Sequence, residues 1–199
     1  MAEQTQSKNT LFPVFLKLET LQLLIVGGGN IGLEKLEAVL VNSPETHIKI
    51  VAREFIGEVR RLASGHPNVS LVEKEFDPAD LDGMELVILA TNDNALNAEI
   101  KKLTRERKLL CNVADKPDLC DFYLGSIVQK GDLKIAISTN GKSPTVAKRI
   151  KEFLNEEIPE TIQEVLDNMG AIRDRLKGDF EHKVKSLNEV TKGWLGSGK

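Results

Sequence analysis

The first half of the chain alternates short apolar runs with segments whose apolar residues recur at helical spacing. Residues 21–26 form an almost wholly apolar run, which is typical of a strand covered on both faces. Helices are predicted after the glycines that follow this run and over residues 94–108. Further strands are predicted at residues 47–51, 70–72, 86–90 and 109–113, and a turn or single helical turn at residues 77–81. Strands that alternate with helices through short connections predict an α/β protein with a doubly wound parallel sheet.

The second half of the chain has a different pattern. Residues 126–129 and 133–137 flank a short turn that contains Gly131, which predicts a β-hairpin. Ser143 and Pro144 have the residue types of an N-cap and a first helical position, and Pro159 should end the helix that they begin. Amphipathic patterns predict two more helices, at residues 162–176 and 180–187, with Gly178 between them.

A glycine motif connects the first strand to its helix. Gly27, Gly29 and Gly32 form G-x-G-x-x-G, a weak signal alone that becomes informative between a strand and a helix. The first glycine permits the tight turn, the second lets a pyrophosphate approach the backbone, and the third lets the helix pack closely. The helix N-terminus then offers N–H groups and a partial positive charge to phosphates. This context predicts a dinucleotide site; the alternative is a glycine turn that binds nothing.

Residues after the second and fourth strands should complete that site. Arg53 and Glu54 stand where an acid normally bonds the adenosine ribose. Arg53 could pair with a 2′-phosphate and favour NADP, whereas Glu54 could bond the ribose hydroxyls and favour NAD, so the residues leave both open. Thr91, Asn92 and Asp93 either face the cofactor or cap the next helix.

These patterns divide the chain into three predicted parts. Residues 1–113 form a Rossmann-type NAD-binding domain, residues 114–142 a central β segment with the active site, and residues 143–199 a small helical domain.

Catalytic groups are expected just beyond the fifth strand, because the chain has too little length for a large substrate domain. Asp115, Asp118 and Asp121 lie there, and Asp115 is nearest the strand end and any bound nicotinamide. A carboxylate partly removed from water at that point accepts protons readily. We interpret Asp118 and Asp121 as turn or capping residues.

A second candidate site is a basic segment, residues 138–151, which contains four cations and no acid. Its hydroxyl groups, Gly141, Lys142 and a helix N-terminus predict an anion site. The alternative for Lys148, Arg149 and Lys151 is a solvated basic helix face.

Composition limits the possible partners. The 27 Lys and Arg against 30 Asp and Glu give a net charge of −3, which argues against a dedicated nucleic-acid binder. Cys111 and Cys120 are interpreted as buried thiols, and the three histidines lack ligand spacing, so no metal site is expected. With 41% hydrophobic residues, a polar N-terminal segment and no membrane-length apolar run, we expect a cytoplasmic globular protein.

Five segments occur together in an order and spacing that resemble the siroheme synthase family. They are residues 11–16, 27–32, 90–93, 112–115 and 136–144, and the resemblance covers about residues 11 to 155. Members of this family act as precorrin-2 dehydrogenases and some also as sirohydrochlorin ferrochelatases. Because the chain ends at Lys199 without a methyltransferase module, we expect the stand-alone form.

The resemblance implies NAD-dependent oxidation of precorrin-2 to sirohydrochlorin, with ferrous iron as a further substrate where chelation occurs. It also implies a homodimer formed through the central segment, residues 114–142, and the helical part. Asn30, Ile31 and the motif glycines match the family's cofactor loop, Arg53 and Glu54 its adenosine contact, and Asp115 its catalytic aspartate. Thr139 stands where some members have a serine beside the tetrapyrrole site. The expected substrate-binding residues are Asn112, Ser138, Thr139, Lys142 and Ser143.

Two other functions remain open at this point. A non-catalytic NAD(H) sensor would need neither Asp115 nor an anion site, and a dehydrogenase of another small anionic substrate would need a different specificity.

Overall fold

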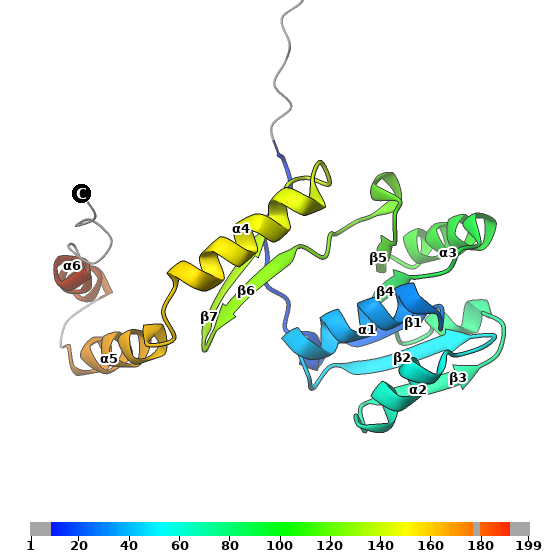
Figure 1. Ribbon diagram of the computed structural model, residues 1–199, viewed down its shortest axis with the longest axis horizontal. Helices are drawn as coiled ribbons and strands as arrows, with labels where there is room; N and C mark the ends of the chain where they lie inside the picture. The colour runs from blue at the N-terminus through cyan, green and yellow to red at the C-terminus, as the bar shows by residue number, and fades with distance from the viewer. Residues whose placement is uncertain (1–8, 177–179, 192–199) are drawn as a thin grey trace, which may run out of the picture. The chain divides into compact units, whose positions relative to one another are not determined.

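The computed structural model describes residues 9–176 and 180–191, which fold into two compact units (Figure 1). One unit is Thr10–Leu124; the other begins at Gly125 and includes Asn9. The expectations for the polar N-terminal segment up to residue 8 and for the helix break at Gly178 lie outside the described residues.

The first unit contains a five-stranded parallel sheet in the order β3-β2-β1-β4-β5. This is the doubly wound arrangement predicted from the sequence, and every strand lies within one residue of its predicted ends. The strands are β1 (Gln22–Val26), β2 (His47–Ala52), β3 (Val69–Glu73), β4 (Leu86–Leu89) and β5 (Leu110–Val113).

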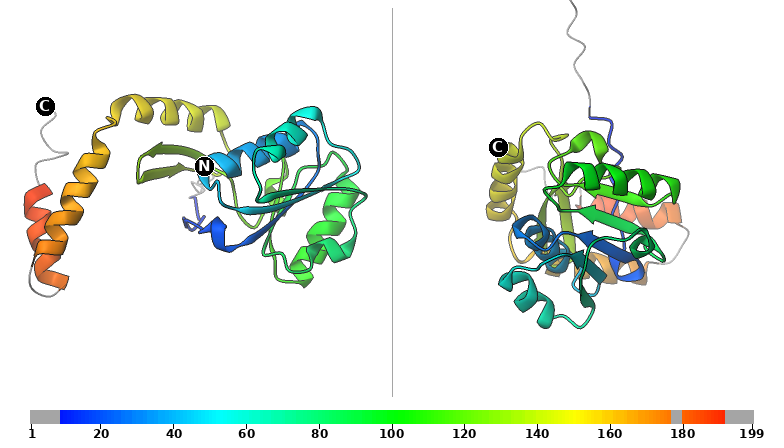
Figure 2. Two further views of the ribbon diagram at one scale, coloured as in Figure 1. Left: turned by 90° about the horizontal axis from the view of Figure 1, so that it is seen from below. Right: turned by 90° about the vertical axis from the view of Figure 1, so that its right-hand side faces the viewer.

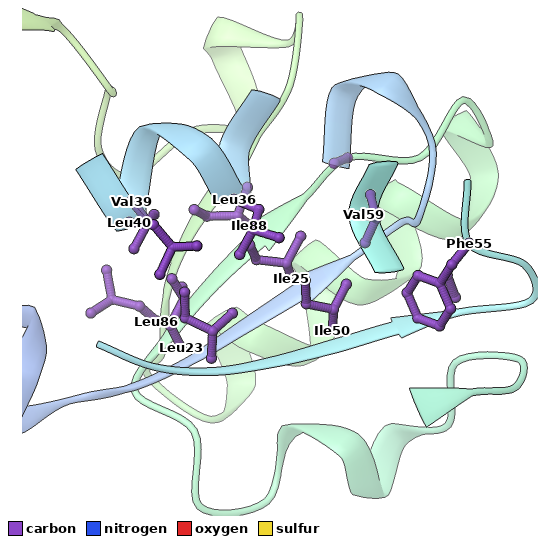
Figure 3. Close-up of a cluster of buried hydrophobic side chains, with 13 residues drawn as sticks. Leu23, Ile25, Leu36, Val39, Leu40, Ile50, Phe55, Val59, Leu86 and Ile88 are labelled. Atoms are coloured by element: carbon purple, nitrogen blue, oxygen red, sulfur yellow. The ribbon is translucent and has the colours of Figure 1, made fainter. Parts of the chain in front are cut away.

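Alternate residues of β1 are buried on opposite faces of this sheet. Leu23 and Ile25 lie under α1 (Asn30–Asn42) and α2 (Gly57–Ser64), as Figure 3 shows. Leu24 and Val26 belong to the other core cluster, with α3 (Asn94–Glu106) and the 3₁₀ helix η2 (Pro78–Leu81). Because these four side chains are no more than 2% exposed, β1 reads as a continuous apolar run rather than an alternating one.

The sequence did not predict α2. This helix has only eight residues, and only Val59 and Ala63 on it are buried, so its apolar pattern is too short to stand out. Two 3₁₀ turns, η1 (Leu18–Thr20) and η3 (Pro117–Leu119), were not predicted either.

The second unit starts with the predicted antiparallel hairpin of β6 (Ser126–Lys130) and β7 (Leu133–Ile137). Three helices follow, as expected, and α5 and α6 lie side by side (Figure 2). The hairpin turn contacts α5 through Gln163, whose Oε1 accepts a hydrogen bond from the Asp132 N–H at 2.7 Å. The helices are α4 (Pro144–Glu157), α5 (Ile162–Arg175) and α6 (Phe180–Thr191).

One apolar face of α4 is exposed in its own unit. Val146, Ile150 and Phe153 are 49%, 40% and 58% exposed, whereas Ala147 is the residue of α4 that is buried. We call these three exposed residues the α4 stripe. Within the described residues, no helix has both the length and the apolar character needed to cross a bilayer.

Candidate active site

The glycine loop after β1 is closely fitted to its neighbours at three positions; at the middle one, Gly28, a Cβ atom would lie 2.3 Å from the Glu54 carbonyl oxygen. Gly27 has φ +124°, and a Cβ atom there would lie 2.4 Å from the Ala90 carbonyl oxygen. A Cβ atom at Gly32 would lie 2.2 Å from the carbonyl oxygen of Gly27. At Gly29, by contrast, a Cβ atom would meet nothing within 4 Å. The loop therefore requires glycine at the first and third motif positions and leaves open space at the second.

That open space lies at the N-terminus of α1. Gly29 is the N-cap residue, no side chain caps the helix, and its first turn holds no acidic residue. Asn30 and Ile31 are the first two helical residues; Asn30 is exposed and Ile31 packs partly against the core. Backbone N–H groups without a side-chain cap, next to a glycine with open space, suit a phosphate group. The loop thus fits the pyrophosphate of a dinucleotide.

A cleft of about 320 Å³ opens beside this loop, large enough for part of a small-molecule ligand. We call it the dinucleotide cleft. It brings Gly27 and Gly29 together with the residues that follow β2, β3 and β4, whereas Asn30, Ile31 and Gly32 lie outside its lining. Its lining residues include Arg53, Glu54, Lys74, Glu75, Thr91, Asn92 and Asp93.

Both cations of the dinucleotide cleft are held by carboxylates. Arg53 Nε lies 3.2 Å from Glu75 Oε1, and Lys74 Nζ lies 2.8 Å from Asp80 Oδ2. Asp80 is only 3% exposed and also accepts a hydrogen bond from Lys49. Burial alone would raise the pKa of Asp80, but hydrogen bonds from the two lysines and from its own turn lower the pKa below the ordinary value of 3.8. Glu54 is exposed.

The segment after β4 both lines the cleft and caps a helix. Asp93 Oδ1 accepts hydrogen bonds from the N–H groups of Ala95 and Leu96, each at 3.0 Å, and so caps α3. The Thr91 hydroxyl donates to Asn97 Oδ1 at 2.7 Å. The two interpretations of this segment are therefore compatible, because the cap that fixes α3 also sets the wall of the cleft.

Asp115 lies at the carboxyl edge of the same sheet. The N–H of Ala114 donates to the Leu89 carbonyl at 2.9 Å, which joins the end of β5 to the end of β4 beside the cleft. Asp115 has φ +58° and is exposed in its unit. The expectation that its carboxylate is partly removed from water does not hold in this unit, because the left-handed turn places it on the surface.

The segment that carries Asp115 is fixed by hydrogen bonds from two side chains, Asn112 and Cys120. This role was not predicted from the sequence for either of them. Cys120 Sγ accepts a hydrogen bond from the Val113 N–H at 3.2 Å and lies 3.3 Å from the Lys116 carbonyl oxygen. Asn112 is buried, and its amide donates to the Phe122 carbonyl at 2.8 Å. These contacts tie both ends of the turn, so we call residues 113–120 the Asp115 loop.

Asp121 and both cysteines make local contacts with the backbone of this region. Asp121 accepts hydrogen bonds from the Cys111 N–H and from Lys101, as expected for a turn residue, and Asp118 lies in η3. Burial raises the pKa of the Cys111 thiol to about 11 and also raises the pKa of Cys120. Both cysteines therefore remain neutral thiols at pH 7. Cys111 is buried as predicted, and Cys120 is half-buried.

In the second unit, the predicted anion-binding residues form the connection between β7 and α4. Thr139 Oγ1 accepts a hydrogen bond from the Ser143 N–H at 3.2 Å, and Ser143 Oγ caps α4 by accepting from Val146 N–H. Ser138 Oγ accepts from the Asn140 N–H at 3.1 Å. Lys142 is exposed. The hydroxyl groups thus shape a turn that ends at the N-terminus of α4.

No group of three or more His, Cys, Asp or Glu side chains is arranged to hold a metal ion in the part of the chain that the structure describes.

The parallel sheet, the glycine loop and the cleft at its carboxyl edge define a Rossmann-type nucleotide-binding protein. Comparison with known proteins agrees: a family model described as "Putative NAD(P)-binding" matches residues 14–126, and one described as "Sirohaem biosynthesis protein central" matches residues 130–157. The chain belongs to the siroheme synthase family and has an NAD(P)-binding domain.

Individual relatives support this assignment. The siroheme synthase of Baumannia cicadellinicola subsp. Homalodisca coagulata is 34% identical over 165 residues, which are 83% of this chain and 35% of that protein. Siroheme synthase 1 of Yersinia enterocolitica is 32% identical over 182 residues, which are 92% of this chain and 37% of that protein. The chain thus spans about a third of the length of these curated relatives.

A solved structure described as "SirC, precorrin-2 dehydrogenase" has a similar fold, with a TM-score of 0.72 and 26% sequence identity. The match covers 90% of this chain and 89% of that one.

Proposed function

We propose that the chain oxidises precorrin-2 to sirohydrochlorin with NAD, a step in siroheme biosynthesis. The observation that carries this proposal is the position of Asp115. The N–H of Ala114, next to Asp115, donates a hydrogen bond to the carbonyl of Leu89 at the end of β4. The residues that follow β4 line the dinucleotide cleft. The similarity to a precorrin-2 dehydrogenase over nine-tenths of the chain supports the choice of substrate.

In this proposal the cofactor is held by the residues around the cleft. The N-terminus of α1, with Gly27, Gly29, Asn30, Ile31 and Gly32, receives the pyrophosphate through backbone N–H groups. Thr91, Asn92 and Asp93 face the nicotinamide half, and Arg53 and Glu54 the adenosine half. NAD is favoured over NADP because both cleft cations already have carboxylate partners, whereas the exposed Glu54 can accept hydrogen bonds from ribose hydroxyls.

Asp115 is the proposed catalytic residue. The oxidation removes a hydride and a proton from the macrocycle, and NAD, when bound, supplies the hydride acceptor. The Asp115 carboxylate takes up the proton or fixes the orientation of the macrocycle. Asn112 holds the end of β5 and so positions the Asp115 loop.

The substrate carries acetate and propionate groups, which require cations and N–H donors. We assign their recognition to Ser138, Thr139, Lys142 and Ser143, at the N-terminus of α4. Insertion of ferrous iron into the product is a second proposed activity, in which Asp115 would receive the pyrrole protons.

The proposal also includes a homodimer located in the cytoplasm. The α4 stripe supports dimerisation, because three large apolar side chains on one helix face gain free energy when a second copy covers them.

The decisive experiment is to incubate the purified protein with precorrin-2 and either NAD or NADP and to follow the absorbance of sirohydrochlorin. Faster product formation with NAD than with NADP is the expected result. A protein that binds NADH but has no affinity for any tetrapyrrole would instead be an NAD(H) sensor. Addition of ferrous iron to sirohydrochlorin tests chelation: siroheme absorbance should rise faster than the spontaneous rate.

A further inference from the structure

Glu75 lies at the edge of the dinucleotide cleft, two residues beyond the end of β3. Its carboxylate lies 3.2 Å from Nε of Arg53, which follows β2. Strand pairing brings them together, because Ala52 pairs with Glu73 and the Lys74 N–H donates to the Ala52 carbonyl at 2.9 Å. The ion pair is therefore a consequence of the sheet register and lies at the adenosine end of the cleft.

Arg53 occupies the position from which an arginine accommodates the 2′-phosphate of NADP in dinucleotide-binding folds. With its guanidinium unpaired, this chain would carry an NADP-selective group. We propose that Glu75 is a specificity-determining residue, which keeps the cleft selective for NAD by engaging Arg53 and by placing a negative charge beside it. This inference rests on the proposed dinucleotide site and not on the tetrapyrrole reaction.

Two electrostatic costs oppose the binding of NADP at Arg53. A phosphate monoester carries a charge of about −1.5 to −2 at neutral pH, so a 2′-phosphate must displace the Glu75 carboxylate from Arg53 and also lie close to it. NAD has an uncharged hydroxyl at the same place, so it neither has to displace Glu75 from Arg53 nor is repelled by the Glu75 carboxylate. Like charges in contact across a binding site select against the wrong ligand.

Lys74, the other cation of the cleft, is not a substitute for Arg53. Its Nζ lies 2.8 Å from Asp80 Oδ2, and Asp80 is only 3% exposed. A carboxylate buried to this extent requires its cationic partners, so moving Lys74 to a phosphate would leave Asp80 poorly compensated. The ion pair of Arg53 and Glu75, by contrast, is 72% and 76% exposed and can be exchanged. Selectivity therefore depends on Glu75.

The test measures nucleotide binding by the full chain without tetrapyrrole, through the fluorescence of NADH and NADPH. Glu75→Gln keeps the size of the side chain and removes its charge. Because the pair is exposed, we expect a moderate effect: NADPH should bind about fivefold more tightly, and NADH should change less than about twofold. The gain should shrink as salt is raised, since the Debye length falls to about 3 Å at 1 M ionic strength.

Two further variants isolate the mechanism. Glu73→Gln is the matched control, because Glu73, the last residue of β3, forms an exposed ion pair with Arg60 of α2 at 2.7 Å and does not line the cleft. It should leave the ratio of NADPH to NADH affinity unchanged. The double variant Arg53→Met/Glu75→Gln should lose the gain in NADPH affinity, because the gain requires the released guanidinium.

Each alternative outcome overturns the inference. These outcomes are an unchanged affinity ratio in Glu75→Gln, an equal shift in Glu73→Gln, a gain that persists in the double variant, or a wild type that prefers NADPH. A wild type that binds both nucleotides but does not oxidise precorrin-2 refutes the proposed reaction and leaves the selectivity result standing. A wild type that binds neither nucleotide refutes both.

Discussion

Replacement of Gly29 by alanine should weaken cofactor binding strongly while leaving the fold intact. The backbone at Gly29 has φ −91° and ψ −162°, an extended conformation open to any residue, and a Cβ atom there meets nothing within 4 Å. The expected cost is that of a poorer N-cap, because alanine is less favourable than glycine at this position, by about 0.5–1 kcal/mol. Unfolding should therefore occur at nearly the same urea concentration as in the wild type.

The effect of Gly29→Ala on the cofactor should be much larger. The added methyl group would stand over the N-terminus of α1, where phosphate oxygens need to come within about 3 Å of the N–H donors. Loss of one hydrogen bond to a charged group costs about 1.5–3 kcal/mol, which corresponds to a 10- to 150-fold weaker binding of NADH.

Gly32→Ala is the matched comparison, since it adds the same methyl group three residues further along the chain, inside α1. Its Cβ would lie 2.2 Å from the Gly27 carbonyl oxygen, so the backbone must move by about 1 Å, and overpacking of this kind costs about 1–3 kcal/mol. This variant should lose both stability and binding. Urea unfolding and NADH titration separate the two cases. If Gly29→Ala binds NADH within twofold of the wild type, the N-terminus of α1 does not hold the pyrophosphate.

Four further variants, at three residues, test the remaining parts of the structure. Asp115→Asn should lower the rate of precorrin-2 oxidation by about 100-fold and leave NADH binding intact; unchanged turnover would remove Asp115 from the mechanism. Cys120→Ala should lower the free energy of unfolding by about 1–2 kcal/mol, measured in urea, and Cys120→Ser should restore part of it; equal stability of all three proteins would contradict the anchoring role. Asp80→Asn should destabilise the protein by about 2–3 kcal/mol at pH 7. Because the pKa of Asp80 is lowered from 3.8 in the folded state, this difference should be constant above that pH and shrink only below it, which thermal unfolding between pH 2 and 7 would check.

The sequence predicted those elements whose signals are local. The strands of the first unit were found because β1 and β4 are apolar at almost every position, as burial on both faces requires. The start of α4 was found because Ser143 and Pro144 are a cap and a first-turn residue, and its end because Pro159 cannot continue a helix. The helix α2 was missed because eight residues with two buried side chains carry little periodicity.

Only those parts of the candidate site that have a local sequence signal were predicted. Glycines that permit a tight turn are visible in the sequence, whereas partners brought together by strand pairing are not. Lys74 and Glu75 follow β3, and the dinucleotide-binding motif includes no position at the end of that strand. Their ion-pair partners, Asp80 and Arg53, lie 6 and 22 residues away in the sequence. The contact of Cys120 with the Asp115 loop depends on the turn after β5 and has no sequence motif.

The net charge of the chain is a poor guide to the ligands of the dinucleotide cleft. Up to Cys111 the chain has 13 cations and 16 acids, which would disfavour an anionic dinucleotide if binding depended on total charge. The acids are not distributed at random, however: Asp80 and Glu75 hold the two cations of the cleft, and the first turn of α1 contains no acid at all. A pyrophosphate at that helix would interact with backbone N–H groups, whose partial charge does not enter the count of ionisable residues. An acidic domain can therefore bind an anion, provided that the acids are paired elsewhere and the helix N-terminus is kept clear of them.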